Sequence, residues 1–222
     1  MRLIAIFGGP GGGAIVAQSL RALAAAGAEI RLLGFLNDVL APGSLVSGVP
    51  VLGPFSAWPS LPPETVFAAS LHKAKENPAR AELVRKLGVP AHRWTTVIDP
   101  LSAVAADAVI GGGCFIGPFA TVGPNARIGA HTTVRAGACV SHDCALGEFV
   151  FLGSGAVVCG YAEAGEGAYI APNATICDRC RVGRFAVVGL GSVVTRDVPD
   201  HLVSIGNPSR AAAGAPPDAT DA

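Results

Sequence analysis

One short segment of this 222-residue sequence combines side chains that could move a proton: Ser141-His142-Asp143-Cys144. A carboxylate beside an imidazole can hold the ring in one tautomer and raise its basicity, which is the arrangement of a general base. An outward-facing histidine next to an aspartate is also common at ordinary solvated corners. The spacing alone therefore leaves both interpretations of His142 and Asp143 open.

A second segment has the residues of a phosphate-binding loop. The apolar run Leu3 to Phe7 is followed by six residues of which five are glycine, 8–13, and then by an alanine-rich stretch, 14–26. A strand, a glycine loop and a helix in this order bring bare N–H groups and the positive end of the helix to a diphosphate. A second apolar run ends in Asn37-Asp38, about where a doubly wound domain contacts a ribose or base. The alternative is a glycine-rich turn followed by a solvated Asn-Asp pair.

The six cysteines include Cys177 and Cys180, whose C-x-x-C spacing is typical of a zinc or redox pair. Five of the six, however, occupy small-residue positions of a repeat described next, and a fourth ligand is missing. We therefore expect no metal and no disulfide.

The element that must position His142 is a repeat of sixteen six-residue units running from Ile98 to Val193. The first position of every unit is aliphatic, the second is glycine in nine units, and the fifth is always Ala, Ser, Thr, Cys or Val. An apolar residue every six positions fits neither a helix nor a long alternating strand, so the sequence predicts a parallel β-helix. We expect glycine to supply the turns through conformations that other residues avoid.

Three hexads would close one triangular coil, so residues 18 apart should stack on neighbouring coils about 4.8 Å apart. Gly160 then lies directly above His142. Because glycine has no side chain, we expect its N–H to be exposed there, and a base beneath a free amide suits acyl transfer through an oxyanion intermediate.

The rest of the chain divides around this repeat. Residues 1–95 alternate apolar strands and helices, which predicts a small parallel α/β domain with further elements at Thr65–Ala69 and from Asn77-Pro78 to Gly88. Residues 96–212 form the β-helix, and the Pro-, Ala- and Asp-rich residues 213–222 are expected to be a disordered tail.

Composition excludes several classes of partner. The formal net charge is zero, with 16 basic and 16 acidic residues, so we expect neither nucleic acid nor an anionic membrane surface as a partner. No apolar stretch has the length of a signal peptide or a membrane span, which favours the cytoplasm.

With these features in hand, the chain resembles the hexapeptide-repeat sugar acyltransferases, in the subgroup of bacillosamine-pathway N-acetyltransferases and sialic acid O-acetyltransferases. The resemblance rests on five segments: residues 7–13, 34–38, 97–103, 141–149 and 205–210. The His-Asp-Cys segment and the closing Gly-Asn-Pro at 206–208 are the most specific parts. The resemblance implies an α/β Rossmann-like domain followed by a left-handed parallel β-helix, a homotrimer, and acetyl-CoA held between two prisms.

It also implies transfer of an acetyl group from acetyl-CoA to the amine of a UDP-, GDP- or dTDP-linked amino sugar. By position, His142 would be the general base and Asp143 the residue that orients it. Three residues would contact the cofactor, of which the last two again stack 18 apart: Gly160, Pro172 and Leu190. Six would bind the nucleotide-sugar: Pro10, Gly11, Gly12, Asn37, Asp38 and Ser70.

Three positions depart from the family pattern. Phe151 stands where many relatives have a second histidine near the acetyl group, and Asn37 replaces an aspartate. Residues 71–78 differ from the usual Gly-Asp/Asn loop. These departures leave the base, the sugar and the oxyanion contact undetermined.

Three other functions fit parts of the pattern. Sugar O-acetylation would use the same base. A non-catalytic trimeric scaffold that binds a nucleotide-sugar would explain the missing second histidine. A γ-carbonic-anhydrase-like enzyme would need three histidines around zinc, and only His131 and His142 lie on the repeat.

Overall fold

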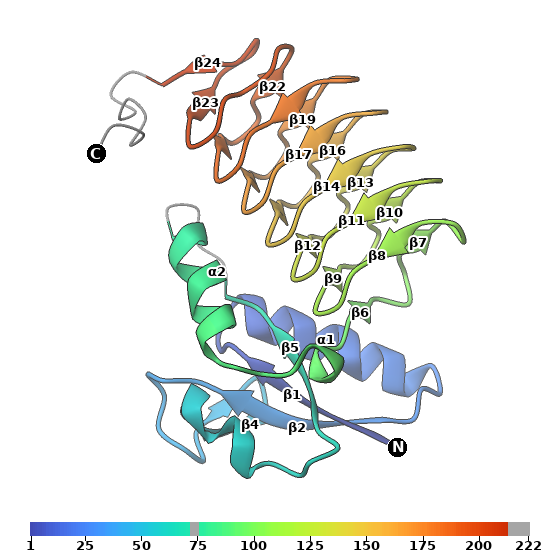
Figure 1. The fold of residues 1–222 in the computed structure, drawn as a ribbon. Coiled ribbons are helices and arrows are strands. Elements are labelled where there is room, and N and C mark those ends of the chain that lie inside the picture. Colours follow the sequence, from blue (N-terminus) through green and yellow to red (C-terminus); the bar gives the residue numbers. More distant parts are fainter. Residues whose placement is uncertain (72–75, 213–222) are drawn as a thin grey trace.

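The structure, a computed structural model, describes residues 1–71 and 76–212. An α/β domain is followed by a triangular prism of short strands, the left-handed parallel β-helix that the repeat and the resemblance predicted (Figure 1). The tail predicted at residues 213–222 and part of the altered loop at 71–78 lie outside the described residues.

The α/β domain is built on a five-stranded sheet in the order β3-β4-β2-β1-β5. Its strands are β1 (Arg2–Phe7), β2 (Ile30–Leu36), β3 (Leu45–Val46), β4 (Val49–Gly53) and β5 (Val66–Ala69). All neighbours pair in parallel except β3 with β4. The three apolar runs predicted as strands are confirmed to within a residue at each end. The β3–β4 hairpin was not predicted, although Ser47 and Gly48 both have the positive φ angles that a two-residue turn requires.

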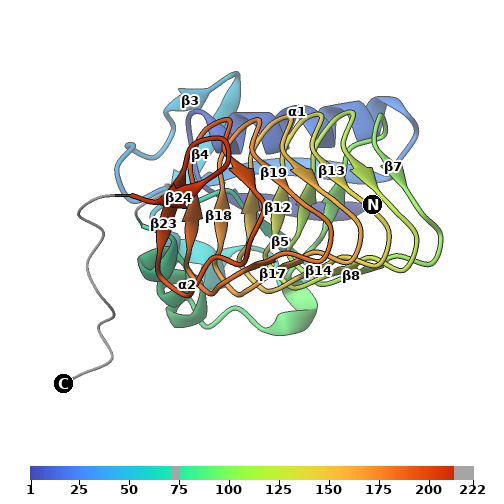
Figure 2. The same ribbon diagram turned by 90° about the horizontal axis from the view of Figure 1, so that it is seen from above.

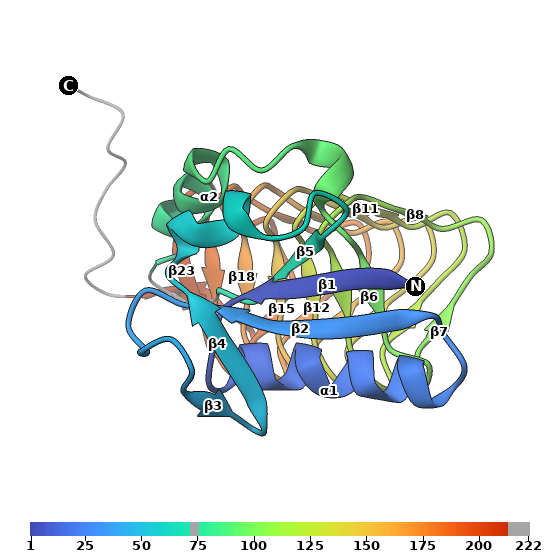
Figure 3. The same ribbon diagram turned by 90° about the horizontal axis from the view of Figure 1, so that it is seen from below.

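Helices cover both faces of this sheet. Helix α1 (Gly12–Ala25) runs alongside β2 (Figure 3). Its Val16, Ala17 and Leu20 share one apolar core with Val97 and Phe115 of the first prism strands. On the other face lie α2 (Asn77–Lys86) and the 3-10 helices η1 (Phe55–Ser60) and η2 (Ala91–Arg93). Strands in the middle of the sheet are therefore fully buried, as their unbroken apolar sequences indicate.

The Asn77-Pro78 pair also suggests that asparagine caps helix α2, and the structure differs from this. Glu76 is the N-cap residue, and Asn77 is already helical and buried. The Asn77 Nδ2 donates a 2.8 Å hydrogen bond to the carbonyl of Gly167 in the prism. Pro78 in the first turn and Gly88 after the last turn, with φ of 65°, bound the helix as predicted.

The prism consists of three sheets of short strands, nearly all two residues long and all parallel except the last strand of one sheet. Figure 2 shows the successive coils stacked one after another. Within the hexad repeat, strands pair residues 18 apart, for example Thr121 with Cys139, as the register predicted. Beyond the repeat the offset changes, and Val187 pairs with Val203, 16 residues away.

We name the three sheets by their position. Sheet I faces the α/β domain and α2, and contains β6 (Val97–Ile98), β9 (Phe115–Ile116), β12 (Thr133–Val134), β15 (Phe151–Leu152), β18 (Tyr169–Ile170), β21 (Val187–Val188), β23 (Val203–Ile205) and the antiparallel β24 (Arg210–Ala211). Sheet II contains β7 (Ala103–Val104), β10 (Thr121–Val122), β13 (Cys139–Val140), β16 (Val157–Val158), β19 (Thr175–Ile176) and β22 (Val193–Val194). Sheet III contains β8 (Val109–Ile110), β11 (Arg127–Ile128), β14 (Ala145–Leu146), β17 (Glu163–Ala164) and β20 (Arg181–Val182).

The expected reason for the repeated glycines was wrong. The second-position glycines do not have the positive φ angles; these occur at the fourth position, in glycines such as Gly113 and in residues such as Asp143 and Phe149. The second-position glycines instead lie against the next coil. A Cβ on Gly129, for instance, would come within 2.5 Å of the backbone of Gly147 and Glu148. Close coil stacking, rather than the turn, requires glycine there.

The interior of the prism is filled by first- and fifth-position side chains, nearly all aliphatic. Cys114, Cys144 and Cys180 are fifth-position members of this core, and all six cysteines are free. Within residues 1–71 and 76–212, no three His, Cys, Asp or Glu side chains are grouped so as to hold a metal ion. In the same ranges, no helix has the length and apolarity needed to span a membrane.

Candidate active site

The side chains of His142 and Asp143 are in direct contact at the corner between sheets II and III. The His142 Nδ1 lies 2.9 Å from Asp143 Oδ2, and the Asn125 Nδ2 donates to the other Asp143 oxygen at 3.1 Å. Asp143 has a left-handed backbone (φ 57°), a conformation that aspartate tolerates better than most residues. Because an ionised carboxylate only accepts hydrogen bonds, this contact favours, for a neutral imidazole, the tautomer with its proton on Nδ1 and its lone pair on Nε2.

Because Gly160 has no side chain, the imidazole of His142 can occupy the space next to its Cα atom. A Cβ on Gly160 would lie 2.8 Å from both Cε1 and Nε2 of His142, so any other residue would displace the ring. Gly160 itself is buried, which differs from the exposed amide that we expected. Tyr161, the next residue, packs its ring edge-on against the imidazole with a centroid distance of 5.2 Å. His142 nevertheless remains open to solvent, with 53% of its side chain exposed.

Pro172 and Leu190 lie at the other edge of sheet II, at its corner with sheet I. Residues 172 and 190 occupy the same position on adjacent coils, and the Gly191 N–H donates to the Pro172 carbonyl at 3.0 Å. Leu190 is 76% exposed. Within one chain, the predicted cofactor residues therefore form two groups, with Gly160 beside His142 and the Pro172–Leu190 pair across the width of sheet II.

A cavity of about 480 Å³ lies between the glycine loop, α2 and sheet I. It is lined by Gly8, Gly9, Pro10, Gly12, Asn37, Ser70, Leu71, Glu76, Ala79, Arg80, Leu83, Arg135 and Phe151. Four of the six residues predicted to bind the nucleotide-sugar, namely Pro10, Gly12, Asn37 and Ser70, are among them. Gly11 and Asp38 are not.

Two of these side chains explain why the loop must contain glycine. A Cβ on Gly9 would lie 2.7 Å from the Asn37 amide nitrogen, and one on Gly12 would collide with the Ser70 hydroxyl. Asn37 also organises its own loop, because its Oδ1 accepts from the N–H groups of residues 39 and 40 and its Nδ2 donates to the Gly8 carbonyl. One amide hydrogen of Asn37 is thus left for a ligand.

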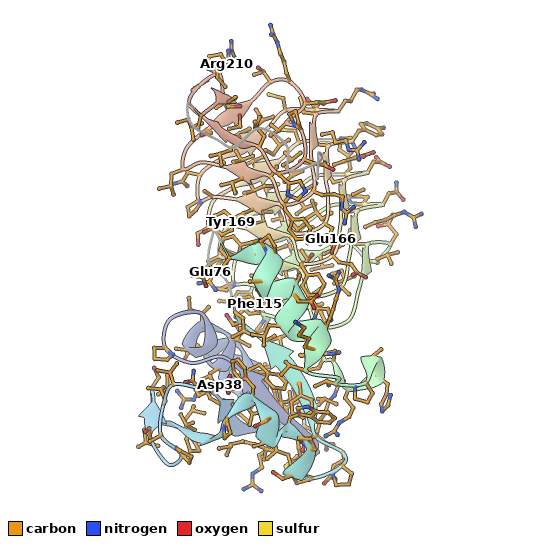
Figure 4. All side chains as sticks on the ribbon, turned by 60° about the vertical axis from the view of Figure 1, so that its left-hand side comes forward. Asp38, Glu76, Phe115, Glu166, Tyr169 and Arg210 are labelled. Carbon is orange, nitrogen blue, oxygen red and sulfur yellow. The ribbon has the colours of Figure 1, made fainter. Side chains whose placement is uncertain are left out.

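Asp38 has a structural contact outside the cavity. Its Oδ1 accepts a 2.6 Å hydrogen bond from the Phe55 N–H at the start of η1. Figure 4 shows Asp38 within the α/β domain, well away from Glu76, which lies at the first turn of α2 beside the prism. Asp38 is exposed, and its second oxygen has no partner among the described residues.

The positive charge of the cavity was not predicted from the sequence. Arg80 and Arg135 line it, yet neither stands in a motif, and burial lowers the pKa of both, that of Arg80 to about 9. The amphipathic spacing of α2 could have indicated that Arg80 faces inward, because it lies on one face with Asn77, Ala81 and Val84.

Phe151 closes the prism side of the cavity. Its ring stacks on Tyr169 of the next coil with a centroid distance of 4.6 Å and an angle of 8°. The Phe151 ring therefore offers an apolar surface where a histidine would offer a donor.

His131 is part of the packing between the domain and the prism. It stacks on Phe149 and meets the edge of Trp94. Burial, with Arg80 and Arg85 nearby, lowers its pKa to about 4, so the ring is neutral at pH 7. Its Nδ1 is buried without a partner in the described chain.

Comparisons with known proteins agree with this architecture. A family model described as bacterial transferase hexapeptide (six repeats) matches residues 107–142. A search of curated protein sequences gives no match. Among solved structures, the acetyltransferase domain of PglB from Neisseria gonorrhoeae, in complex with acetyl coenzyme A, is 30% identical with a TM-score of 0.84. The alignment covers 95% of this chain and 99% of that one.

Two further structures show the same likeness. PerB from Caulobacter crescentus, in complex with CoA and GDP-perosamine, is 28% identical with a TM-score of 0.83, covering 96% of this chain and 97% of that one. WeeI from Acinetobacter baumannii is 27% identical with a TM-score of 0.82, covering 96% and 100%. The two domains are thus found together in these proteins. The chain belongs to the hexapeptide-repeat family of sugar acyltransferases.

Proposed function

We propose that the protein transfers an acetyl group from acetyl-CoA to the amine of a nucleotide-linked amino sugar, with His142 as general base. The observation that carries this proposal is the His142–Asp143 contact beneath Gly160, on a prism that also forms a cavity with a glycine loop. The ligands of the similar structures support it, since one holds acetyl coenzyme A and another holds CoA with GDP-perosamine. The Caulobacter protein is described as a GDP-perosamine N-acetyltransferase.

In the proposed reaction the neutral sugar amine attacks the thioester carbonyl carbon. His142 Nε2 accepts the proton that the nitrogen loses, and the carbon–sulfur bond then breaks as the tetrahedral intermediate collapses. CoA leaves as a thiolate and is protonated by the imidazolium, so His142 returns to its neutral form. Asp143 keeps the second ring nitrogen protonated and stabilises the transient positive charge.

The cavity is the proposed site of the nucleotide-sugar. We assign residues 1–95 to nucleotide-sugar binding and residues 96–212 to acyl transfer. The glycine loop precedes α1, whose first N–H groups have no side-chain cap and can point to a diphosphate. Within this assignment Pro10, Gly12, Asn37 and Ser70 contact the ligand directly, Gly11 supplies the left-handed turn into α1 (φ 76°), and Asp38 positions η1.

A trimer would bring the two parts of the site together. In one chain the cavity opens on sheet I, whereas His142 lies at the far edge of sheet II. The outward side chains of sheet II carry no charge: Ala103, Thr121, Cys139, Val157, Thr175 and Val193. Those of sheet III include Arg127, Glu163 and Arg181. Sheet II is thus suited to contact another copy, with acetyl-CoA between His142 of one prism and Pro172 and Leu190 of its neighbour.

Replacement of His142 tests the proposal. His142→Ala should lower kcat for acetyl transfer by about 10²- to 10⁴-fold, the usual contribution of a general base, while the Kd for the nucleotide-sugar stays within about twofold. His92→Ala is the matched control, because His92 is an exposed histidine of η2 away from both parts of the site.

The assay measures CoA release with UDP-, GDP- and dTDP-linked amino sugars, followed by mass spectrometry of the product. Full activity in His142→Ala would refute the role of the base. An O-linked acetyl group in the product would show that the enzyme acetylates a sugar hydroxyl and not the amine. Nucleotide-sugar binding with no turnover of any acyl-CoA by the wild type would identify a scaffold instead.

A further inference from the structure

Arg80 is a buried cation with incomplete pairing. Only 5% of the residue is exposed, and its Nη2 makes one long hydrogen bond, 3.3 Å, to the His131 carbonyl. The Nε and Nη1 atoms are buried and have no partner in the described chain. A guanidinium withdrawn from water without matching acceptors is costly, so something besides folding is expected to retain it.

The surroundings of Arg80 do not neutralise it. No described carboxylate forms an ion pair with Arg80, unlike Arg85 beside it on α2, which pairs with Glu148 and Glu166. The Phe149 ring lies 5.8 Å from the guanidinium, and His131 is neutral. Burial lowers the pKa of Arg80 to about 9, so the group is still charged at pH 7.

The same side chain belongs to the wall of the cavity. Two faces of α2 meet at Arg80. One face lines the cavity with Glu76, Ala79 and Leu83, and the other is buried with Asn77, Ala81 and Val84. Arg135 lines the cavity from the prism, and the loop before α1 lines it from the α/β domain. Two arginines and the positive end of a 14-residue helix therefore act on one cavity, whose described lining residues include one carboxylate, that of Glu76.

We propose that Arg80 is a specificity-determining residue that selects ligands carrying a diphosphate, by donating its unpaired N–H groups to the phosphate oxygens in this cavity. The inference rests on the proposed function, because it assigns the diphosphate of the nucleotide-sugar to the cavity. A guanidinium suits this task, since its rigid donors match phosphate oxygens in pairs. Arg80 acts in binding and takes no part in proton transfer.

Binding measurements separate this role from a structural one. The probes are UDP, GDP and dTDP, each compared with its own nucleoside by calorimetry at two salt concentrations. Arg80→Met should weaken the best diphosphate by about 10- to 150-fold, the range of one or two charge-assisted hydrogen bonds, and leave the nucleoside unaffected. Arg80→Lys keeps the charge with fewer donors and should give a smaller loss.

Thermal unfolding of the ligand-free protein provides the second measurement. A methionine has no buried charge to desolvate, so Arg80→Met should unfold at the same temperature as the wild type or higher. Lys86→Met is the control, because it removes one exposed charge from the same helix and should change neither property.

The outcomes distinguish this inference from the proposed function. If Arg80→Met lowers the melting temperature or prevents folding, or binds the diphosphate as tightly as the wild type, the inference is wrong and Arg80 is structural. Acetyl transfer by the wild type would still stand in that case. The opposite outcome is that the wild type acetylates no amino sugar, yet Arg80→Met binds the diphosphate more weakly than the wild type does. The proposed function then fails and the inference stands.

Discussion

The replacement Gly160→Ala should inactivate the enzyme by moving His142, although it removes no atom. The new Cβ would lie 2.8 Å from His142 Cε1 and Nε2, whereas carbon atoms in contact normally approach to about 3.5–4.0 Å. The ring must therefore shift by close to 1 Å. Because Nδ1 is 2.9 Å from Asp143, a shift of that size breaks the hydrogen bond that orients the base.

The expected loss in kcat is about 10²-fold, since a misplacement of 1 Å can remove that much. The effect on stability should be small, below about 1 kcal/mol, because the obstructed atoms belong to a side chain that is 53% exposed and can rotate away. Gly112→Ala is the matched control. Gly112 occupies the same third position of its hexad, and its Cβ would have the Trp94 carbonyl oxygen as nearest neighbour at an ordinary 3.8 Å.

A double-mutant cycle in the acetyl-transfer assay tests the reasoning. If Gly160→Ala acts through the imidazole, it should have almost no further effect in a His142→Ala background. An equal loss in both backgrounds would refute this explanation and indicate that Gly160 contacts the acyl donor directly. Full activity in Gly160→Ala alone would show that the position of the ring is unimportant.

Three further predictions concern stability. Gly129→Ala should lower the free energy of unfolding by about 2 kcal/mol or more, because its Cβ would come within 2.5 Å of rigid backbone of the next coil; an unchanged denaturation midpoint would contradict this. Folding lowers the pKa of His131 to about 4, so between about pH 6.5 and pH 4 the unfolded chain binds one more proton than the folded chain. The contribution of His131 to the free energy of unfolding is therefore complete above about pH 6.5. It falls by on the order of 2 kcal/mol as the pH drops toward 4. The test is His131→Phe, which the left-handed backbone at this position tolerates, because Phe119 and Phe149 have the same conformation. In urea titrations at several pH values, the free energy of unfolding of this variant should change less between pH 6.5 and 4 than that of the wild type. An unaltered dependence on pH would rule out His131 as its source. The hydrogen bond from Arg85 lowers the pKa of Glu166, so this pair stabilises the folded protein above about pH 4.5 and does so less as the pH falls further. Arg85 and Arg184 are about half exposed, so solvent screens their interaction with Glu166. Glu166→Gln should therefore lower the free energy of unfolding by only about 0.5–1 kcal/mol at pH 7, and by less in 1 M salt.

The prism was predictable because its contacts repeat locally in sequence. Within the hexad repeat each coil touches the next at an offset of 18 residues, so the register alone places Gly160 over His142 and Leu190 over Pro172. The same regularity misled in one respect. A repeated glycine suggests a turn with a positive φ angle. In the structure the positive φ angle occurs at the fourth position of the hexad, and the glycines at the second position lie against the next coil. This difference depends on how the coils stack, which the sequence alone does not show.

The cavity could not be derived in this way, because its walls come from segments with no common spacing. The glycine loop, Asn37 and Ser70 belong to the α/β domain, Arg80 to α2, and Arg135 and Phe151 to different coils of the prism. The glycine-loop motif indicated one wall, whereas Arg80 stood in no motif. Likewise, Asp38 matched a binding position in sequence and lies against η1 in the structure.

The sequence by itself thus determined the prism, the partners of each coil and the His142–Asp143 pair, since all of these follow from neighbours at fixed short separations. Only the tertiary structure decided that an arginine lies buried beside the glycine loop with no counter-ion among residues 1–71 and 76–212, and that the cavity and His142 face different sides of one chain. The physical reason is that burial and unpaired charge depend on how α2 packs between the domain and the prism. That packing is set by long-range contacts such as Asn77 to Gly167, which no local pattern encodes.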